Sequence, residues 1–233
     1  MQTIHKLSII FSILLLSCTA TLLNVPQAKN WSDIFPEVVN SVVKIEIIET
    51  ETPKGDLTIG HGSGFVISKN GHIVTSAHVA LVIMYLNSPK LQVKFNNNKE
   101  FTVQAIYVVP KYDIAILKIN AKNLDYLKIE DKETKIGQEV LSIGSTGKIL
   151  NFAATQGIVS NNVDDSIPWL RATSQIYPGF SGGPLVNKDG NVVGINTAIS
   201  QKYSTISFFI PSSILLKVIK EDLKSMLPNL LTD

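Results

Sequence analysis

The feature that most constrains this chain is a succession of short Val- and Ile-rich segments separated by Gly, Asn and Asp turns. Segments of this length and spacing are typical of an all-β sandwich or barrel. A linker at Ala121–Lys135 divides them into two groups of six, which predicts two six-stranded antiparallel β-barrels. The first group comprises Val42–Thr50, Leu57–Ser68, Ile73–Thr75, Leu91–Asn96, Phe101–Val109 and Ile114–Ile119. The second comprises Glu139–Ser145, Ala153–Ser160, Leu170–Thr173, Leu185–Asn187, Val192–Thr197 and Thr205–Ile210.

Turns and helices complete the expected fold. Asn70-Gly71 is a type I′ hairpin signal between two strands of the first group. A short helix is expected at Trp31–Asn40, with Ser32 or Asp33 as its N-cap. Apolar residues recur at helical spacing over residues 212–227, which predicts a C-terminal helix packed on the β core. The folded domain is therefore expected at residues 31–233, with barrels at about 38–120 and 136–211.

The amino terminus has the pattern of a secretory signal. Lys6 precedes the apolar run Leu7–Leu16, and small residues follow it. This arrangement predicts a signal peptide at residues 1–20, with a tether at residues 21–30. The apolar run is too short to span a bilayer comfortably. Export to the periplasm or cell envelope is therefore expected.

Cys18 is the only cysteine, and two fates are open for it. Leu15-Leu16-Ser17-Cys18 resembles the bacterial lipobox, which implies cleavage before Cys18 and a lipid anchor to the membrane. The alternative is ordinary signal cleavage after Ala20, with no lipid. In either case residues 31–233 contain no cysteine, so the domain has no disulfide and is stabilised by its core.

Charge and histidine spacing exclude several classes of function. Charged residues make up 17% of the chain, the net charge is +2, and Arg171 is the only arginine. The lysines are spread along the chain, which argues against nucleic-acid binding. The three histidines outside the signal show no metal-ligand spacing. Neither a metal nor another cofactor is expected.

A candidate nucleophile lies in the segment Tyr177–Leu185 (YPGFSGGPL). Glycines around Ser181 permit a sharp turn that exposes its hydroxyl, because glycine adopts dihedral angles closed to other residues. Such a turn can also aim the backbone amides of Gly179 and Ser181 into one space, which is the layout of an oxyanion hole. A simple Gly-Ser-Gly linker is the alternative.

A serine nucleophile needs a base, and a histidine base needs an acid to orient it. His78 follows a strand that has the pattern of a buried one, with small residues directly before it. Asp113 begins the apolar run that ends at Leu117, so it is expected at the mouth of a buried strand. The alternatives are a core histidine and a strand-edge aspartate without a catalytic role.

These motifs, in this order, resemble the chymotrypsin-like (trypsin-fold) serine proteases and, more closely, their bacterial HtrA/Deg branch. The resemblance covers roughly residues 35–220 and runs through Gly62–Ile67, Ser76–Val79, Asp113–Leu117, Gly157–Ser160, Gly179–Leu185, Gly190–Ala198 and Ile210–Ser212. It implies a protease domain with Ser181 as nucleophile, His78 as general base and then acid, and Asp113 as the residue that orients His78. It also implies that Gly179 and Ser181 donate to the oxyanion. The activity implied is a serine endopeptidase of protein quality control that cleaves unfolded or exposed polypeptide segments.

Two departures qualify the resemblance. Phe180 stands where HtrA proteins usually have Asn and trypsin-like enzymes have Asp, so activation by an ion pair at this position is excluded. The ring could pack the loop into its active shape or hold it inactive. A non-catalytic binding protein on the protease scaffold is therefore the alternative function. We also expect no peptide-binding PDZ domain after residue 227, and the amino-terminal residues Trp31 and Phe35 are candidates for a homotrimer contact, with a monomer as the alternative.

The expected substrate pocket has no acidic residue, which argues against selectivity for Lys or Arg. Its walls are expected from residues 174–177 and 196–199, which include Asn196 and Thr197, and Ile176, Ala198 and Ile199 among them favour a small or medium aliphatic side chain. Ile195 is expected on the strand edge beside the substrate. The alternative is that these are ordinary core side chains. Main-chain pairing of the substrate with residues 195–197 would add binding that does not depend on sequence.

Overall fold

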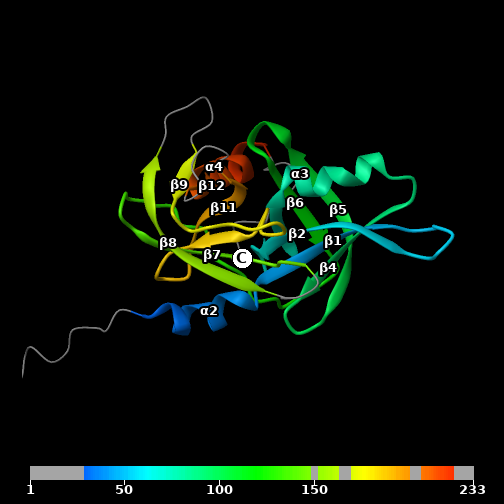
Figure 1. Ribbon diagram of the computed structural model, residues 1–233, viewed down its shortest axis with the longest axis horizontal. Helices are drawn as coiled ribbons and strands as arrows, with labels where there is room; N and C mark the ends of the chain where they lie inside the picture. The colour runs from blue at the N-terminus through cyan, green and yellow to red at the C-terminus, as the bar shows by residue number, and fades with distance from the viewer. Residues whose placement is uncertain (1–28, 148–151, 163–168, 200–205, 223–233) are drawn as a thin grey trace, which may run out of the picture.

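The computed structural model describes residues 29–147, 152–162, 169–199 and 206–222, which form two closed barrels side by side (Figure 1). The first barrel has the strand order β1-β2-β3-β6-β5-β4 and the second has β10-β11-β12-β9-β8-β7, with antiparallel neighbours throughout. The strands of the first barrel are β1 (Val42–Glu49), β2 (Leu57–Val66), β3 (His72–Ser76), β4 (Pro89–Phe95), β5 (Glu100–Val109) and β6 (Ile114–Ile119). Those of the second are β7 (Glu139–Gly144), β8 (Ala153–Asn162), β9 (Leu170–Ala172), β10 (Pro184–Val186), β11 (Val192–Ile199) and β12 (Ser207–Pro211). The prediction of an all-β fold with two six-stranded antiparallel barrels is confirmed.

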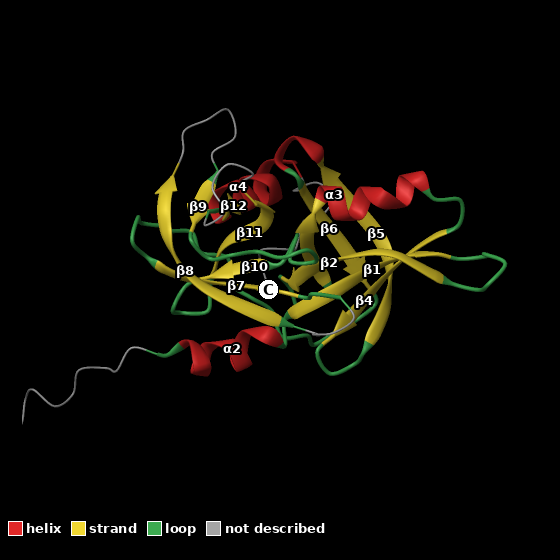
Figure 2. Cartoon of the chain, in the orientation of Figure 1, coloured by secondary structure: helices red, strands yellow, loops and turns green. Residues whose placement is uncertain are grey.

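Helices lie at the two ends of the described chain and beside the first barrel (Figure 2). α2 (Trp31–Val39) begins after Asn30, whose amide donates to the Asp33 carboxylate at 3.2 Å, so the N-cap prediction of Ser32 or Asp33 was wrong. At the other end, α4 (Ser212–Lys217) continues into a π-helical turn, η3 (Val218–Asp222). The remaining elements are α3 (Ala77–Leu81) and the short 3₁₀ turns η1 (Val82–Tyr85) and η2 (Pro110–Tyr112).

Several expectations fall outside the described residues. These are the signal at 1–20 with Cys18, all but the end of the tether, and the last residues of the predicted C-terminal helix. Among the helices that the structure describes, none has the length and apolar character needed to cross a membrane.

The connection between β2 and β3 differs from its prediction. A type I′ turn requires positive φ at both central residues, yet here only Gly71 (φ +86°) has it and Asn70 does not. The Gly71 amide instead donates to the Ser68 carbonyl at 3.3 Å, and β2 ends at Val66. The chain therefore makes a wider loop, because the strands stop pairing several residues before the glycine.

The buried side chains form a core inside each barrel and a third core between them. In β4 burial alternates, since one face points into the first barrel and the other toward solvent. β6 is buried on both faces, because its outer face meets the second barrel. The interbarrel core combines side chains of the first barrel (Val42, Phe65, Val74, Ile114, Ile116), the second barrel (Leu141, Ile143, Val186, Val192, Ile195, Ile210), the linker (Leu127), and the terminal helices (Ile34, Val38, Leu215, Val218, Ile219). Residues of the expected site lie along this junction.

Candidate active site

His78 and Asp113 meet because their strands are neighbours in the first barrel. β3 leads into α3, and β6 begins directly after Asp113. The two strands pair from His72 opposite Lys118 to Ser76 opposite Ile114, which places the residues just beyond them side by side. The backbone continues this pairing, since the Ala77 amide donates to the Asp113 carbonyl at 2.9 Å. Residues far apart in the sequence are thus brought together by strand register.

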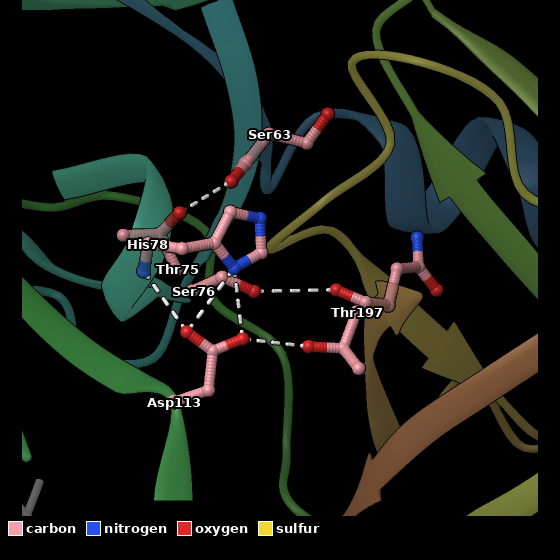
Figure 3. Close-up of polar contacts among 7 residues, drawn as sticks. Ser63, Thr75, Ser76, His78, Asp113 and Thr197 are labelled. Atoms are coloured by element: carbon pink, nitrogen blue, oxygen red, sulfur yellow. Dashed lines mark hydrogen bonds and ion pairs between the residues drawn. The ribbon is translucent and has the colours of Figure 1, made fainter. Parts of the chain in front are cut away.

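The Asp113 carboxylate lies between the His78 ring and Thr197 (Figure 3). His78 Nδ1 lies 2.8 Å from one carboxylate oxygen and 3.1 Å from the other, and the His78 backbone amide donates at 2.9 Å. The Thr197 hydroxyl of the second barrel donates at 2.8 Å. Burial alone would raise the pKa of Asp113, but the hydrogen bonds and charge of His78, with the Thr197 hydroxyl, hold it below its ordinary value. The carboxylate therefore stays ionised, and it fixes Nδ1 of His78 as the nitrogen that faces it.

The second ring nitrogen of His78 points away from Asp113 (Figure 3). Half of the His78 side chain is exposed, with a relative accessibility of 50% against 25% for Asp113. An imidazole held on one side by a carboxylate and open on the other has the arrangement of a general base.

Ser181 lies in the loop between β9 and β10, and this loop packs directly on the first barrel. The Ser181 carbonyl accepts a hydrogen bond from the Ser63 amide at 2.8 Å. At Gly182 (φ +84°) a Cβ would overlap the Ser63 carbonyl and the Thr75 hydroxyl and would lie 2.7 Å from the Ser76 amide. Ser76 is the N-cap of the short helix that carries His78. Only a glycine at position 182 lets the serine turn approach the histidine this closely.

Of the three peptides that directly precede Ser181, two are held by hydrogen bonds among the described residues. The Gly179 carbonyl accepts from the Ser63 hydroxyl at 2.6 Å, and the amide of the same peptide, at Phe180, donates to Tyr177 at 2.8 Å. The Phe180 carbonyl accepts from the amide of Gly183 at 2.9 Å. In the part of the chain that the structure describes, the amides of Gly179 and Ser181 donate to no acceptor. They are the two expected oxyanion donors.

The Ser181 hydroxyl and the His78 ring share no hydrogen bond among the described residues. Their backbones nonetheless converge. A Cβ at Gly62 would stand 2.6 Å from the side chain of Val79, the neighbour of His78, and 3.3 Å from the Ser181 carbonyl. Bonds between a nucleophile and its base are often long before substrate binds. Direct contact between these two groups stays a prediction.

Phe180 does not cover the serine turn. Its side chain is fully buried in the core of the second barrel, where it meets the Tyr177 ring edge-on at a centroid distance of 5.7 Å. Gly144 leaves room for it, since a Cβ there would lie 2.7 Å from the Phe180 ring. The buried Phe180 ring thus holds the serine loop against the core of the second barrel.

The residues expected around the substrate differ in burial. Ile176 is 5% exposed and lies in the core of the second barrel, while Ile195 is 0% exposed and lies in the interbarrel core, which favours the alternative that these are core side chains. Asn196 is also fully buried. Its side-chain amide donates to the carbonyls of Ile143 at 3.0 Å and Phe180 at 3.2 Å, and its oxygen accepts from the Ser142 hydroxyl at 3.0 Å. Asn196 therefore holds the serine loop in place and has no free group for substrate.

The other two expected pocket residues differ from each other. The Thr197 hydroxyl donates a hydrogen bond to the Asp113 carboxylate, so Thr197 stabilises the histidine–aspartate pair. Ala198 is exposed, and it is followed by Ile199, which is 50% exposed. Of the expected wall, Gln175, Tyr177, Ala198 and Ile199 present side chains to solvent.

Sequence reasoning missed the role of Ser63. Its hydroxyl donates to the Gly179 carbonyl at 2.6 Å and accepts from the Ser145 amide at 2.8 Å, so one buried side chain joins β2 to two segments of the second barrel. The glycines that flank it in the sequence were the available signal, because they mark a close approach of backbones. No group of three or more His, Cys, Asp or Glu residues lies close enough to hold a metal ion in the described ranges.

Comparison with known proteins gives the same assignment at the level of the family. A family model described as a trypsin-like peptidase domain matches residues 62–195. The chain is 38% identical over 173 residues to a probable periplasmic serine endoprotease DegP-like of Marinomonas sp. (strain MWYL1), covering 70% of this chain and 35% of that protein. It is 35% identical over 170 residues to the protein of the same name from Chlamydia muridarum, covering 69% of this chain and 33% of the relative. The chain spans about a third of the length of these curated relatives.

A solved structure resembles the fold. The serine endoprotease from Yersinia pestis aligns with a TM-score of 0.69 and 28% sequence identity, over 85% of this chain and 67% of that one.

Proposed function

Because the chain belongs to the trypsin-like peptidase family, we propose that it is a serine endopeptidase that cleaves unfolded or exposed polypeptide segments. The observation that carries this proposal is the meeting of His78, Asp113 and Thr197 beside a glycine-packed serine turn. The His–Asp pair is formed by one barrel and the turn by the other, and the amides of Gly179 and Ser181 have no acceptor among the described residues. Each of these features has a role in acyl transfer by serine.

The proposed reaction proceeds through an acyl-enzyme. Ser181 Oγ attacks the scissile carbonyl carbon while His78 Nε2 accepts the hydroxyl proton. Asp113 stabilises the resulting imidazolium, and the amides of Gly179 and Ser181 donate to the oxyanion. His78 then returns the proton to the leaving amine. Water, deprotonated by His78, hydrolyses the ester and restores the Ser181 hydroxyl.

Substrate is proposed to bind along the end of β11. β10 pairs with β11 as far as Ile195, and the carbonyl and amide of Asn196 are bonded to Gly182 and Gly183, while β11 continues to Ile199. Main-chain groups of residues 197–199 would pair with an extended peptide whatever its sequence, which suits unfolded protein as substrate. No acidic side chain lies in residues 195–199, so we expect no preference for Lys or Arg. A peptide-library profile dominated by cleavage after basic residues would contradict this reading.

The proposed place of action is the periplasm or cell envelope. The relatives are named as periplasmic, and residues 1–20 have the pattern of a secretory signal. Mass spectrometry of the mature amino terminus separates lipidation of Cys18 from cleavage after Ala20. Light scattering on a size-exclusion column separates a homotrimer from a monomer. The rings of Trp31 and Phe35, the candidate trimer contacts, are partly buried against the interbarrel core.

Labelling with a fluorophosphonate probe tests the proposed function, because the probe reacts only with an activated serine. We expect the full chain to be labelled at Ser181, identified by peptide mapping, and to degrade denatured casein. Ser181→Ala abolishes labelling and lowers cleavage by about 10⁶-fold or to the detection limit. Ser213→Ala, a change of the same kind at an exposed serine of α4, leaves both unchanged.

The opposite outcome supports the non-catalytic alternative. A folded wild-type chain that binds denatured casein but is neither labelled nor able to cleave it would be a binding protein on a protease scaffold. Casein cleavage that persists in purified Ser181→Ala would show that another residue, or a contaminant, carries the activity.

A further inference from the structure

His61 lies on the face of β2 that meets the second barrel. Side chains alternate along a strand, so His61 shares this face with Ser63. The His61 ring lies between two glycine backbones of the second barrel. Its Nε2 is 2.9 Å from the point where a Cβ would stand at Gly147 and 2.8 Å from the corresponding point at Gly179. Both glycines have positive φ, +86° and +94°. The ring thus occupies the space directly behind the first expected oxyanion donor.

The ring packs beside Gly179, whose amide donates to no acceptor in the described chain. Ser63 holds the Gly179 carbonyl, but the Gly179 amide belongs to the preceding peptide. A Cβ at Gly179 would overlap the Ser145 carbonyl and would lie 2.8 Å from His61 Nε2. The carbonyl and the ring together therefore fill the space on this side of Gly179, and the ring is the side-chain contact that supports the backbone carrying this amide.

Packing alone does not account for a histidine at this position. His61 Nε2 is buried and has no hydrogen-bond partner among the described residues. A buried polar atom without a partner lowers stability, and an apolar ring of similar size would avoid that cost. What histidine adds to an apolar ring is the ability to take up a proton.

The surroundings of His61 keep it uncharged near neutral pH. Burial lowers its pKa from the ordinary value of 6.5, the charge of Lys44 on β1 lowers it further, and Glu46 on β1 opposes them. Glu46 is itself paired with Lys44 at 2.7 Å and with Lys94 of β4 at 3.1 Å. Residues 145–147 and 178–180, which pack against the ring, carry no ionisable side chain. An imidazolium would have no carboxylate partner in these two segments.

We propose that His61 is a positioning residue: its uncharged ring holds the Gly179 amide in the orientation that an oxyanion needs, and its protonation releases the loop in acid. This inference rests on the proposed function. The charged ring must find an acceptor or water, so it leaves the space between Gly147 and Gly179, and the amide behind the oxyanion loses its support.

The rate of fluorophosphonate labelling tests this proposal on the full chain, because the phosphoryl oxygen develops charge where the oxyanion forms. We expect His61→Ala to lower the maximal inactivation rate about tenfold at pH 8 while the apparent binding constant of the probe changes less than about twofold. His61→Phe, which refills the space, retains the rate within about threefold. His72→Ala, at a histidine that bonds to Ser68 away from the site, leaves the rate unchanged.

The pH profile separates positioning from a merely structural role. In acid the wild-type rate should fall more steeply than that of His61→Phe, because the wild type additionally requires an uncharged His61. This comparison remains decisive if His61→Ala fails to fold, which circular dichroism would reveal.

Each of the other possible results contradicts either the role of His61 or the proposed function as a whole. If His61→Ala labels at the wild-type rate, or if the acid limbs of wild type and His61→Phe coincide, the role of His61 is wrong while the serine protease stands. If wild type is not labelled at Ser181, the proposed function fails and this inference fails with it.

Discussion

At the scale of single residues, the Asp113 carboxylate is the most densely bonded group of the site. It accepts from the backbone and ring of His78 and from the Thr197 hydroxyl, which comes from the other barrel. Three donors on two oxygens fix both the position of the carboxylate and its charge. Thr197 is therefore a positioning residue of the pair rather than a wall of the substrate pocket.

Replacing Thr197 tests this role. Thr197→Val removes one hydrogen bond to a charged group and should lower kcat/KM about tenfold. Thr197→Ser keeps the hydroxyl and should retain activity. Equal loss of activity in both variants would mean that the methyl group, and not the hydroxyl, is what matters.

The same variant has a pH signature. The pKa of Asp113 is lowered in the folded protein, so the unfolded state binds more protons, and this group stabilises the fold above its ordinary pKa of 3.8. That stability is lost as the pH falls through the lowered value. In Thr197→Val the folded pKa rises toward the ordinary one, so we expect stability to be lost at higher pH on acidification. Urea unfolding of both proteins between about pH 2 and pH 6 measures the difference.

Site residues could be predicted from the sequence where the proposed chemistry requires a particular residue type. Ser181, His78 and Asp113 were named from their neighbours in the sequence, and the structure brings His78 and Asp113 into contact. Ile176 lies in a core, and this could not be predicted because an aliphatic residue looks the same in the sequence whether it faces a pocket or a core. The packing of His61 could not be predicted, since its neighbours Gly147 and Gly179 lie far along the chain.

At the scale of elements, β2 links the two halves of the site through one face. Phe65 enters the interbarrel core, Ser63 bonds to Gly179 and Ser145, and His61 packs beside Gly147. Gly62 and Gly64 between them, on the opposite face, allow close approach to the first barrel's own side chains Val79 and Ile45. A single strand therefore determines how the serine loop sits on the histidine side.

Removing the Ser63 hydroxyl tests this link. Ser63→Ala leaves the Gly179 carbonyl and the Ser145 amide without their partner in a buried site, which should cost about 1–3 kcal/mol in the free energy of unfolding. The labelling rate of Ser181 should fall as well, because the Gly179 peptide is no longer held. Ser88→Ala, whose hydroxyl bonds to the exposed Glu51, should change stability by less than about 0.5 kcal/mol. Unchanged denaturation of Ser63→Ala would show that water replaces the hydroxyl.

The type of each element could be predicted from the sequence, whereas its exact ends could be predicted less well. All twelve strands were expected close to their observed positions, because alternation and β-branched residues mark them. The type I′ turn at Asn70-Gly71 was wrong, since turn type depends on where pairing between β2 and β3 stops, at Val66 and Ile73. That is a property of the two strands together and not of the dipeptide.

At the scale of the whole molecule, the interbarrel core is shared by both barrels, the linker and the terminal helices. Each barrel also has its own interior core. Separating the barrels would expose Phe65 and Val74 on one side and Leu141 and Ile143 on the other. This shared burial favours folding as a single cooperative unit.

Equilibrium unfolding tests that cooperativity. The two tryptophans, Trp31 on α2 and Trp169 before β9, both pack against the interbarrel core. We expect their fluorescence and the far-ultraviolet circular dichroism to report one coincident transition in urea. Trp169→Phe leaves only the α2 probe, and its midpoint should match the dichroism of the same variant. Two separated transitions would mean that the barrels unfold independently.

The architecture followed from the sequence because the number and grouping of strands specify it. Two groups of six around a linker predicted two barrels, as the structure has. The contact between the two barrels could not be predicted from the sequence. Packing of Gly182 on Ser63 and of His61 on Gly179 depends on how two separately closed surfaces fit, and no local pattern encodes that fit.

Because the two barrels are synthesised one after the other, the residues of the site become available at different times. His78 and Asp113 come from strands that are synthesised first, whereas Ser181 and Thr197 arrive only near the end of the chain. A growing polypeptide therefore holds an imidazole and its carboxylate with no alcohol to deprotonate. Under the proposed function, the molecule is harmless to itself and to neighbouring nascent chains until its last strands close.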